Sequence, residues 1–173
     1  MRSHLVIILS FVFLLGAKAQ TLKYEFVKSC IDMPETEMIS YFATHNFNFV
    51  TKDHVNLGDN LINRSDYYSS KAANSLDSAE IAVFVNKRKG SKKSVVLSFT
   101  EPSARKNFEE LDASIQNYLT KESSFLSERF SNVNVSKYVD GKNFVYVFRD
   151  DFIFYIIATN YSLDDNYFKI RTK

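Results

Sequence analysis

The chain has 173 residues, with 22 lysines and arginines against 20 aspartates and glutamates, one cysteine and no tryptophan. A single cysteine cannot form an internal disulfide, so the core has to hold the fold together. The near balance of charges gives no indication of a surface built for nucleic acid or for an anionic membrane. Sixteen phenylalanines and ten tyrosines beside four glycines and two prolines are typical of a packed domain rather than a disordered chain.

The first 19 residues are typical of a secretory signal peptide. They have a basic start, an apolar run from Leu5 to Leu15 and a small-residue motif that ends at Ala19. We therefore expect cleavage between Ala19 and Gln20, a mature chain of 20–173, and a secreted or periplasmic location. The apolar run is shorter than the ~20 residues that cross a bilayer as a helix, so no stable membrane anchor is expected. Cleavage would remove two basic residues from a chain of net charge +2 and leave it formally neutral.

The first elements of the mature chain are predicted to be a lead-in and a helix. Apolar and polar residues alternate over 22–27, which favours a short strand or an extended segment. Asp32 and Glu35 have the spacing of a helix capping box, and an apolar stripe follows them. A helix is therefore predicted over 33–45, and a strand is expected to begin at Phe47.

The middle of the chain predicts a long polar region followed by a hairpin. Residues 52–78 are too many for a bare connection in a compact domain, so we expect them to contain a strand or helical turn or to form a mobile loop. Within them, 67–73 is the candidate strand. Apolar runs then predict strands at 81–85 and 95–99, joined by a hairpin loop.

That loop is strongly basic. Clustered lysine and arginine side chains can bind phosphates, polyanionic glycans or a membrane surface. The alternative is a solvated hairpin tip that blunts edge pairing, and the absence of interleaved aromatic residues argues against nucleic acid as the partner. The candidate anion-binding residues are Lys87, Arg88, Lys89, Lys92 and Lys93.

The second half of the chain repeats this type of organisation. Apolar residues at helical spacing predict a helix over 103–121, and a further helical turn is expected over 124–130. A strand is predicted over 133–138, with a turn at 140–141 leading into the next strand. A last short strand is expected over 167–170.

The most apolar stretch without helical spacing is 143–159, which predicts a central β-hairpin. Asp150 and Asp151 interrupt it, and aspartate tolerates the backbone of a tight two-residue loop. The expected cross-strand pairs are Phe148–Ile153, Tyr146–Tyr155 and Phe144–Ile157.

Both faces of this hairpin are apolar, so both should be covered. One cover is expected to be a helix, and the other to be a further layer, a partner or a ligand. We expect Val147 and Phe154 to face the core. Tyr146 and Tyr155 are expected to be partly open and to form a possible interface, because their hydroxyls would otherwise need buried hydrogen-bond partners.

The order helix, strand, hairpin occurs over 33–100 and again over 103–159. We therefore predict a single α+β domain in which antiparallel sheet packs against two main helices, with a possible tandem duplication. This element order resembles beta-lactamase-inhibitor-protein-like domains and uncharacterised exported proteins of Bacteroidetes-type bacteria. The resemblance transfers no functional residue.

No catalytic or cofactor-binding motif stands out, and no cofactor is expected. Cys30 is predicted to be a small buried side chain. The leading hypothesis is an exported, non-enzymatic domain that binds an unknown protein or cell-envelope component, without nucleic acid as a partner. The alternatives are an unrecognised hydrolase or metal-dependent enzyme that uses His45 or His54, and polyanion or surface binding through the basic loop 87–93.

Overall fold

The computed structural model describes residues 22–57, 60–68, 80–88, 90–130, 132–163 and 165–168, so the predicted signal peptide lies outside the described residues. The helices are α2 (Tyr24–Asp32), α3 (Glu35–Thr44), α4 (Arg105–Tyr118) and the single turn α5 (Asp165–Phe168). The strands are β1 (Asn48–Leu57), β2 (Asn60–Tyr68), β3 (Ile81–Arg88), β4 (Lys92–Thr100), β5 (Thr120–Ser127), β6 (Val133–Asp140), β7 (Asn143–Asp150) and β8 (Ile153–Thr159).

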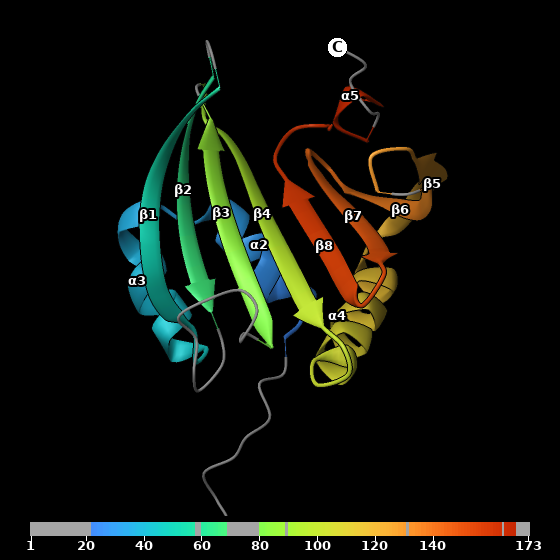
Figure 1. The fold of residues 1–173 in the computed structure, drawn as a ribbon, viewed down its shortest axis with the longest axis horizontal. Coiled ribbons are helices and arrows are strands. Elements are labelled where there is room, and N and C mark those ends of the chain that lie inside the picture. Colours follow the sequence, from blue (N-terminus) through green and yellow to red (C-terminus); the bar gives the residue numbers. More distant parts are fainter. Residues whose placement is uncertain are drawn as a thin grey trace, which may run out of the picture.

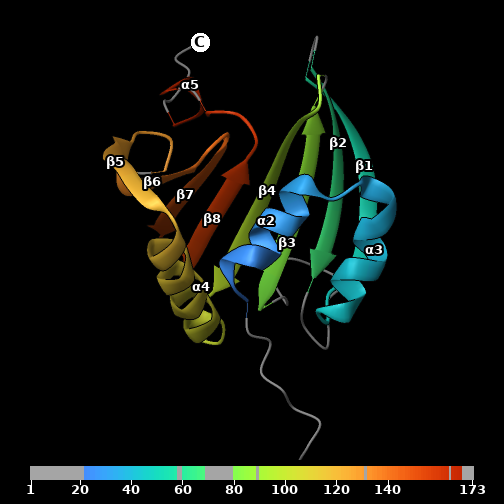
Figure 2. The ribbon, with the colours of Figure 1, turned by 180° about the vertical axis from the view of Figure 1, so that it is seen from behind.

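All eight strands form one antiparallel sheet in the order β1-β2-β3-β4-β8-β7-β6-β5. Helices α2, α3 and α4 lie side by side on one face of it, as the two opposite views show (Figures 1 and 2). We call this the helix face and the opposite side the second face. Alternation along the central strands places Val83, Leu97, Val145 and Ile156 in the core beneath the helices. The predicted α+β class, with antiparallel sheet packed on helices, is confirmed.

The two halves of the sheet have the same register. In each half of the chain a helix is followed by a four-stranded meander: α3 precedes β1–β4, and α4 precedes β5–β8. Both first strands carry a register shift at the same place, between Phe49 and Thr51 in β1 and between Lys121 and Ser123 in β5. The corresponding register pairs are Phe49–Tyr67 with Lys121–Tyr138, Ser65–Val85 with Ser136–Val147, and Tyr67–Val83 with Tyr138–Val145.

Where the halves meet, β4 and β8 pair about a local two-fold axis. By the same correspondence Val95 matches Ile156 and Leu97 matches Ala158, since these residues face equivalent positions of β3 and β7. Where β4 and β8 meet, Val95 pairs with Ala158 and Leu97 pairs with Ile156. If each residue is replaced by its match in the other half, the first of these pairs becomes the second. The pair Val96–Ile157 between them therefore marks the axis. The sheet is thus built as an isologous dimer within one chain.

The central hairpin forms as predicted, but its register differs by two residues. Asp150 pairs with Ile153, so the loop is Asp151 and Phe152 rather than Asp150 and Asp151. Asp151 has φ 50, the left-handed backbone that aspartate tolerates in a two-residue turn. The predicted pairs are therefore wrong, and the observed pairs are Phe148–Tyr155, Tyr146–Ile157 and Phe144–Thr159.

A shift of two residues leaves every side chain on its predicted face, because the side-chain period of a strand is two. Val147 and Phe154 are buried in the helix-face core, as expected. Tyr146 belongs to a separate cluster on the second face, where Leu163 and Phe168 from the end of the chain cover the hairpin.

This cover overturns the expectation that the aromatic face is open at Tyr146. Only 1% of Tyr146 is exposed. The Leu163 amide donates to its hydroxyl over 2.9 Å, and the hydroxyl donates to the Leu163 carbonyl at 3.4 Å. The Phe168 ring lies 5.3 Å from the tyrosine ring. Tyr155, by contrast, is partly exposed.

The N-terminal expectation of a strand or extended segment over 22–27 is wrong, because α2 begins at Tyr24. The alternation is real but short, and Val27, Cys30 and Ile31 continue the apolar residues at helical spacing. The capping box does not form either: Asp32 is the last residue of α2, and α3 begins after Pro34. The predicted helix over 33–45 is confirmed as α3.

Two C-terminal expectations are also wrong. The helical turn predicted over 124–130 is replaced by β5, an edge strand whose pairing with β6 runs along its length while most of its side chains stay exposed. Where a short strand was predicted over 167–170, Tyr167 and Phe168 belong to the helical turn α5, and 169–170 lies outside the described residues. Both segments are short, so tertiary contacts rather than local periodicity decide the structure.

The described part of the long polar region forms strands. Residues 48–57 and 60–68 form the hairpin of β1 and β2, the outermost pair at one edge of the sheet. The candidate strand over 67–73 coincides with β2 only at its start, and 69–79 lies outside the described residues. The strands predicted at 81–85 and 95–99, and the helix predicted over 103–121, appear as β3, β4 and α4.

Candidate functional site

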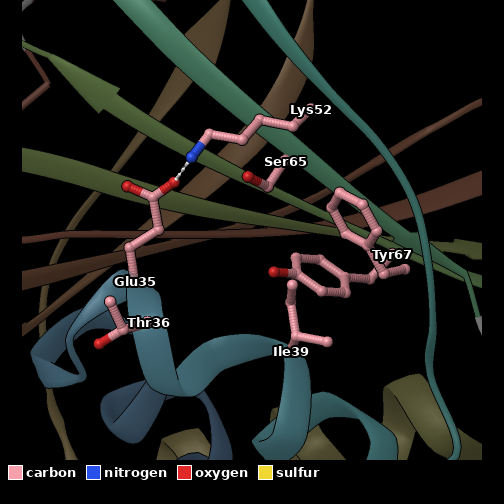
Figure 3. A pocket seen from close by; sticks show the side chains of 7 residues that line it. Glu35, Thr36, Ile39, Lys52, Ser65 and Tyr67 are labelled. Atoms are coloured by element: carbon pink, nitrogen blue, oxygen red, sulfur yellow. Dashed lines mark hydrogen bonds and ion pairs between the residues drawn. The ribbon is translucent and has the colours of Figure 1, made fainter.

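A groove opens between α3 and the first two strands. Its volume is about 330 Å³, and we call it the α3 groove. Side chains from the N-terminal half of α3 form one wall, and side chains of β1 and β2 form the other (Figure 3). The lining residues are Glu35, Thr36, Ile39, Phe49, Lys52, Ser65 and Tyr67.

The apolar part of the groove is unusually exposed. Ile39 is 54% exposed and Phe49 is 42% exposed, although both are large apolar side chains. Tyr67 forms the floor beneath them: it stacks on Phe42 at 4.1 Å and meets the edge of Phe49 at 5.5 Å. Burial, with a smaller contribution from Glu35, raises the pKa of Tyr67 to about 12, so its hydroxyl stays protonated.

An ion pair closes the polar end of the groove. Lys52 of β1 reaches Glu35 at the start of α3, and the two side chains point toward each other (Figure 3). A carboxylate in the first turn also suits the positive end of the helix dipole. The hydrogen bond from Lys52, helped by the charges of Lys87 and Lys93, lowers the pKa of Glu35. Three lysines therefore surround one carboxylate.

Lys93 has a structural role rather than a place in the basic loop. It is 9% exposed, and its ammonium donates to the carbonyl of Cys30 at 3.0 Å and to that of Met33. These are carbonyls at the end of α2, where helices lack intrahelical partners and cations are favoured. The candidate anion-binding set is thus reduced, since β4 turns this residue onto the helix face.

The other basic residues are split by strand alternation. Lys87 is exposed on the helix-face side, whereas Arg88 and Lys92 pair across the hairpin on the second face, and Lys89 lies outside the described residues. The Arg88 guanidinium and the Lys92 ammonium lie 6.0 and 5.5 Å from the ring of Tyr161. The loop is therefore not one continuous cationic surface.

The two candidate histidines lie on different elements, and the side chain of His54 lies outside the described part of the structure. His54 lies in β1 opposite Asn63. His45 ends α3, where its Nδ1 donates to the Tyr41 carbonyl over 2.9 Å and its ring lies 4.5 Å from that of Tyr41. Across the described ranges no group of three or more His, Cys, Asp or Glu side chains could hold a metal ion.

Cys30 is buried, as predicted, and burial raises the pKa of its thiol. A thiol with a raised pKa is a poor nucleophile at neutral pH.

Sequence reasoning missed the α3 groove. Ile39 belongs to the apolar stripe that predicted α3, and such a stripe is expected to face the core. The exposure of Ile39 depends on how the helix lies over β1, which the stripe does not indicate. Phe49 comes from another element, so no local pattern links the two residues.

Within the part of the chain that the structure describes, no helix is long and apolar enough to cross a membrane. Comparisons with protein-family models, curated proteins and solved structures found no match to this chain. The resemblance in element order thus stays a prediction without support from a relative.

Proposed function

We propose that this protein is a non-catalytic binding domain whose α3 groove holds part of a protein or cell-envelope component outside the cytoplasm. One observation carries the proposal. Of the five large apolar side chains exposed among the described residues, Ile39 and Phe49 line the same groove. Exposed apolar side chains are common singly, but their gathering in a concave site is typical of a binding surface.

The charges around the groove favour a partner with an acidic group beside an apolar one. The Glu35–Lys52 pair is partly exposed, so it contributes only ~0–1 kcal/mol to stability and opens at little cost. An incoming carboxylate can then bind Lys52, with the positive charge of Lys87 nearby. The apolar group would cover Ile39 and Phe49 and stabilise the complex by about 25 cal/mol for each Å² removed from water.

The predicted signal peptide supports action outside the cytoplasm. The partner should therefore be sought among secreted and envelope proteins or surface components of the native host.

Affinity capture with matched variants tests the proposal. Immobilised wild-type protein, Ile39→Asp and Phe49→Asp would be compared, with Phe152→Asp as the control because Phe152 is 73% exposed at the distant tip of the β7–β8 hairpin. We expect one partner to be retained by the wild type and the control and lost by both groove variants. A partner retained equally by all four folded proteins, as judged by circular dichroism, would contradict the groove as the binding surface.

A further inference from the structure

A second cavity lies between α4 and the outer strands of the other half of the sheet. Its volume is about 360 Å³, and we call it the α4 pocket. Its polar groups come from three elements: Asp112 and Gln116 from α4, Lys121 from β5, and Ser136 and Tyr138 from β6.

The α4 pocket occupies the position that corresponds to the α3 groove. Ser136 and Tyr138 match Ser65 and Tyr67, because they face equivalent residues of the third strand in each half. Lys121 matches Phe49, since both lie opposite the matched tyrosine and just before the register shift.

The helices extend this correspondence. Helix α3 buries Met38 and Phe42, and α4 buries Phe108, Leu111 and Ile115. Leu111 and Ile115 are four positions apart, as Met38 and Phe42 are. The residue after the first member of this matched pair is Ile39 in α3 and Asp112 in α4. The exposed apolar pair of the first site is therefore replaced by an acidic and a basic side chain in the second.

Asp112 is only half satisfied by its surroundings. Its Oδ2 accepts a hydrogen bond from the Gln116 amide over 2.8 Å, whereas Oδ1 is buried and has no hydrogen-bond partner among the described residues. Burial raises the pKa of this carboxyl, while Gln116 and Lys121 act in the opposite direction. A buried carboxylate oxygen without a partner calls for a donor, which a ligand or a water molecule can supply.

We propose that the α4 pocket binds a small zwitterion of the α-amino-acid class, whose ammonium donates to Asp112 Oδ1 and whose carboxylate lies against Lys121. Lys121 disfavours a ligand that carries only positive charge, and Asp112 disfavours one that carries only negative charge. The hydroxyls of Ser136 and Tyr138 add neutral hydrogen-bonding groups to the same wall. A cavity of this size falls in the range of small-molecule sites. The proposal uses residues separate from the α3 groove, so the two can fail independently.

Backbone amide NMR with defined probes tests the proposal. The 20 common L-amino acids would be titrated singly into the ¹⁵N-labelled mature protein, with ethylammonium and acetate as probes that carry one charge each. We expect at least one amino acid to give saturable shifts at Asp112, Gln116 and Ser136, and each single-charge probe to bind at least tenfold more weakly. Asp112→Asn should weaken the binding of that amino acid at least tenfold.

Asp151→Asn, an exposed aspartate at the β7–β8 turn, is the matched control and should leave binding unchanged. Lys121→Met should weaken amino-acid binding but not that of ethylammonium. Shifts from no amino acid at millimolar concentration, or shifts that persist in a natively folded Asp112→Asn protein, would overturn the proposal and leave water as the occupant.

Discussion

Removal of one hydroxyl, by Tyr146→Phe, probes how the end of the chain covers the central hairpin. In the wild type that hydroxyl accepts from the buried Leu163 amide at 2.9 Å. The substitution keeps the ring and its packing but leaves this amide without a partner. A buried donor left unpaired costs about 1–3 kcal/mol. For a domain of this size each kcal/mol lowers Tm by roughly 2–4 °C, so we expect a clear drop in thermal melts.

Tyr155→Phe provides the matched control. Tyr155 lies on the same face, stacked on Phe148 at 5.1 Å, but its hydroxyl makes no hydrogen bond with any described residue. Its loss should change stability by less than about 0.5 kcal/mol. Hydrogen exchange at the Leu163 amide adds a local readout, with protection expected in the wild type and in Tyr155→Phe. A Tyr146→Phe protein that melts like the wild type and still protects Leu163 would refute the reasoning.

Three further substitutions test other parts of the structure. Lys93→Met leaves the carbonyls at the end of α2 without their ammonium donor, so it should lower the free energy of unfolding by on the order of 1–3 kcal/mol in urea melts. The control, Lys92→Met, changes an exposed neighbour and should be nearly neutral. Equal losses for the two variants would refute the capping role. Burial raises the pKa of Asp112, so this carboxyl makes the folded state less stable as pH rises from its unfolded-state pKa through its folded-state pKa. Asp112→Asn should therefore raise Tm at neutral pH and have no effect at about pH 2.5. A lower Tm at pH 7 would contradict this. The Tyr24 hydroxyl donates to Asp140 over 2.8 Å and lowers the pKa of that carboxyl. The stability that this gives is present above the unfolded-state pKa of Asp140 and is lost as pH falls through the folded-state pKa, so Tyr24→Phe should cost about 1 kcal/mol at pH 7 and less near pH 2 in chemical denaturation. A cost independent of pH would count against the pair.

Long, strongly periodic elements could be predicted from the sequence. Phe108, Leu111 and Ile115 recur at helical spacing, and they are the residues that α4 buries. The two faces of the central hairpin were also predictable, because alternation alone assigns them. The register of the hairpin could not be predicted in this way. A loop at Asp150-Asp151 and a loop at Asp151-Phe152 satisfy the same alternation, and they differ only in which residue takes the left-handed backbone.

Short elements and the candidate sites depended on tertiary structure. The alternation over 22–27 covers too few residues to exclude the helix that actually forms. Both cavities require side chains from a helix and from strands that lie far apart in the sequence. Their relation became visible only through the strand register, because matching positions such as Phe49 and Lys121 differ in chemistry.

The central claim is that the α3 groove is the surface that meets a partner, and site-specific photocrosslinking in the native host tests it most directly. A photoreactive phenylalanine analogue at Ile39 should give a discrete crosslinked product in protein recovered from that host. The same analogue at Phe152, which is more exposed but outside the groove, should give none. Products at Phe152 with none at Ile39 would contradict the account.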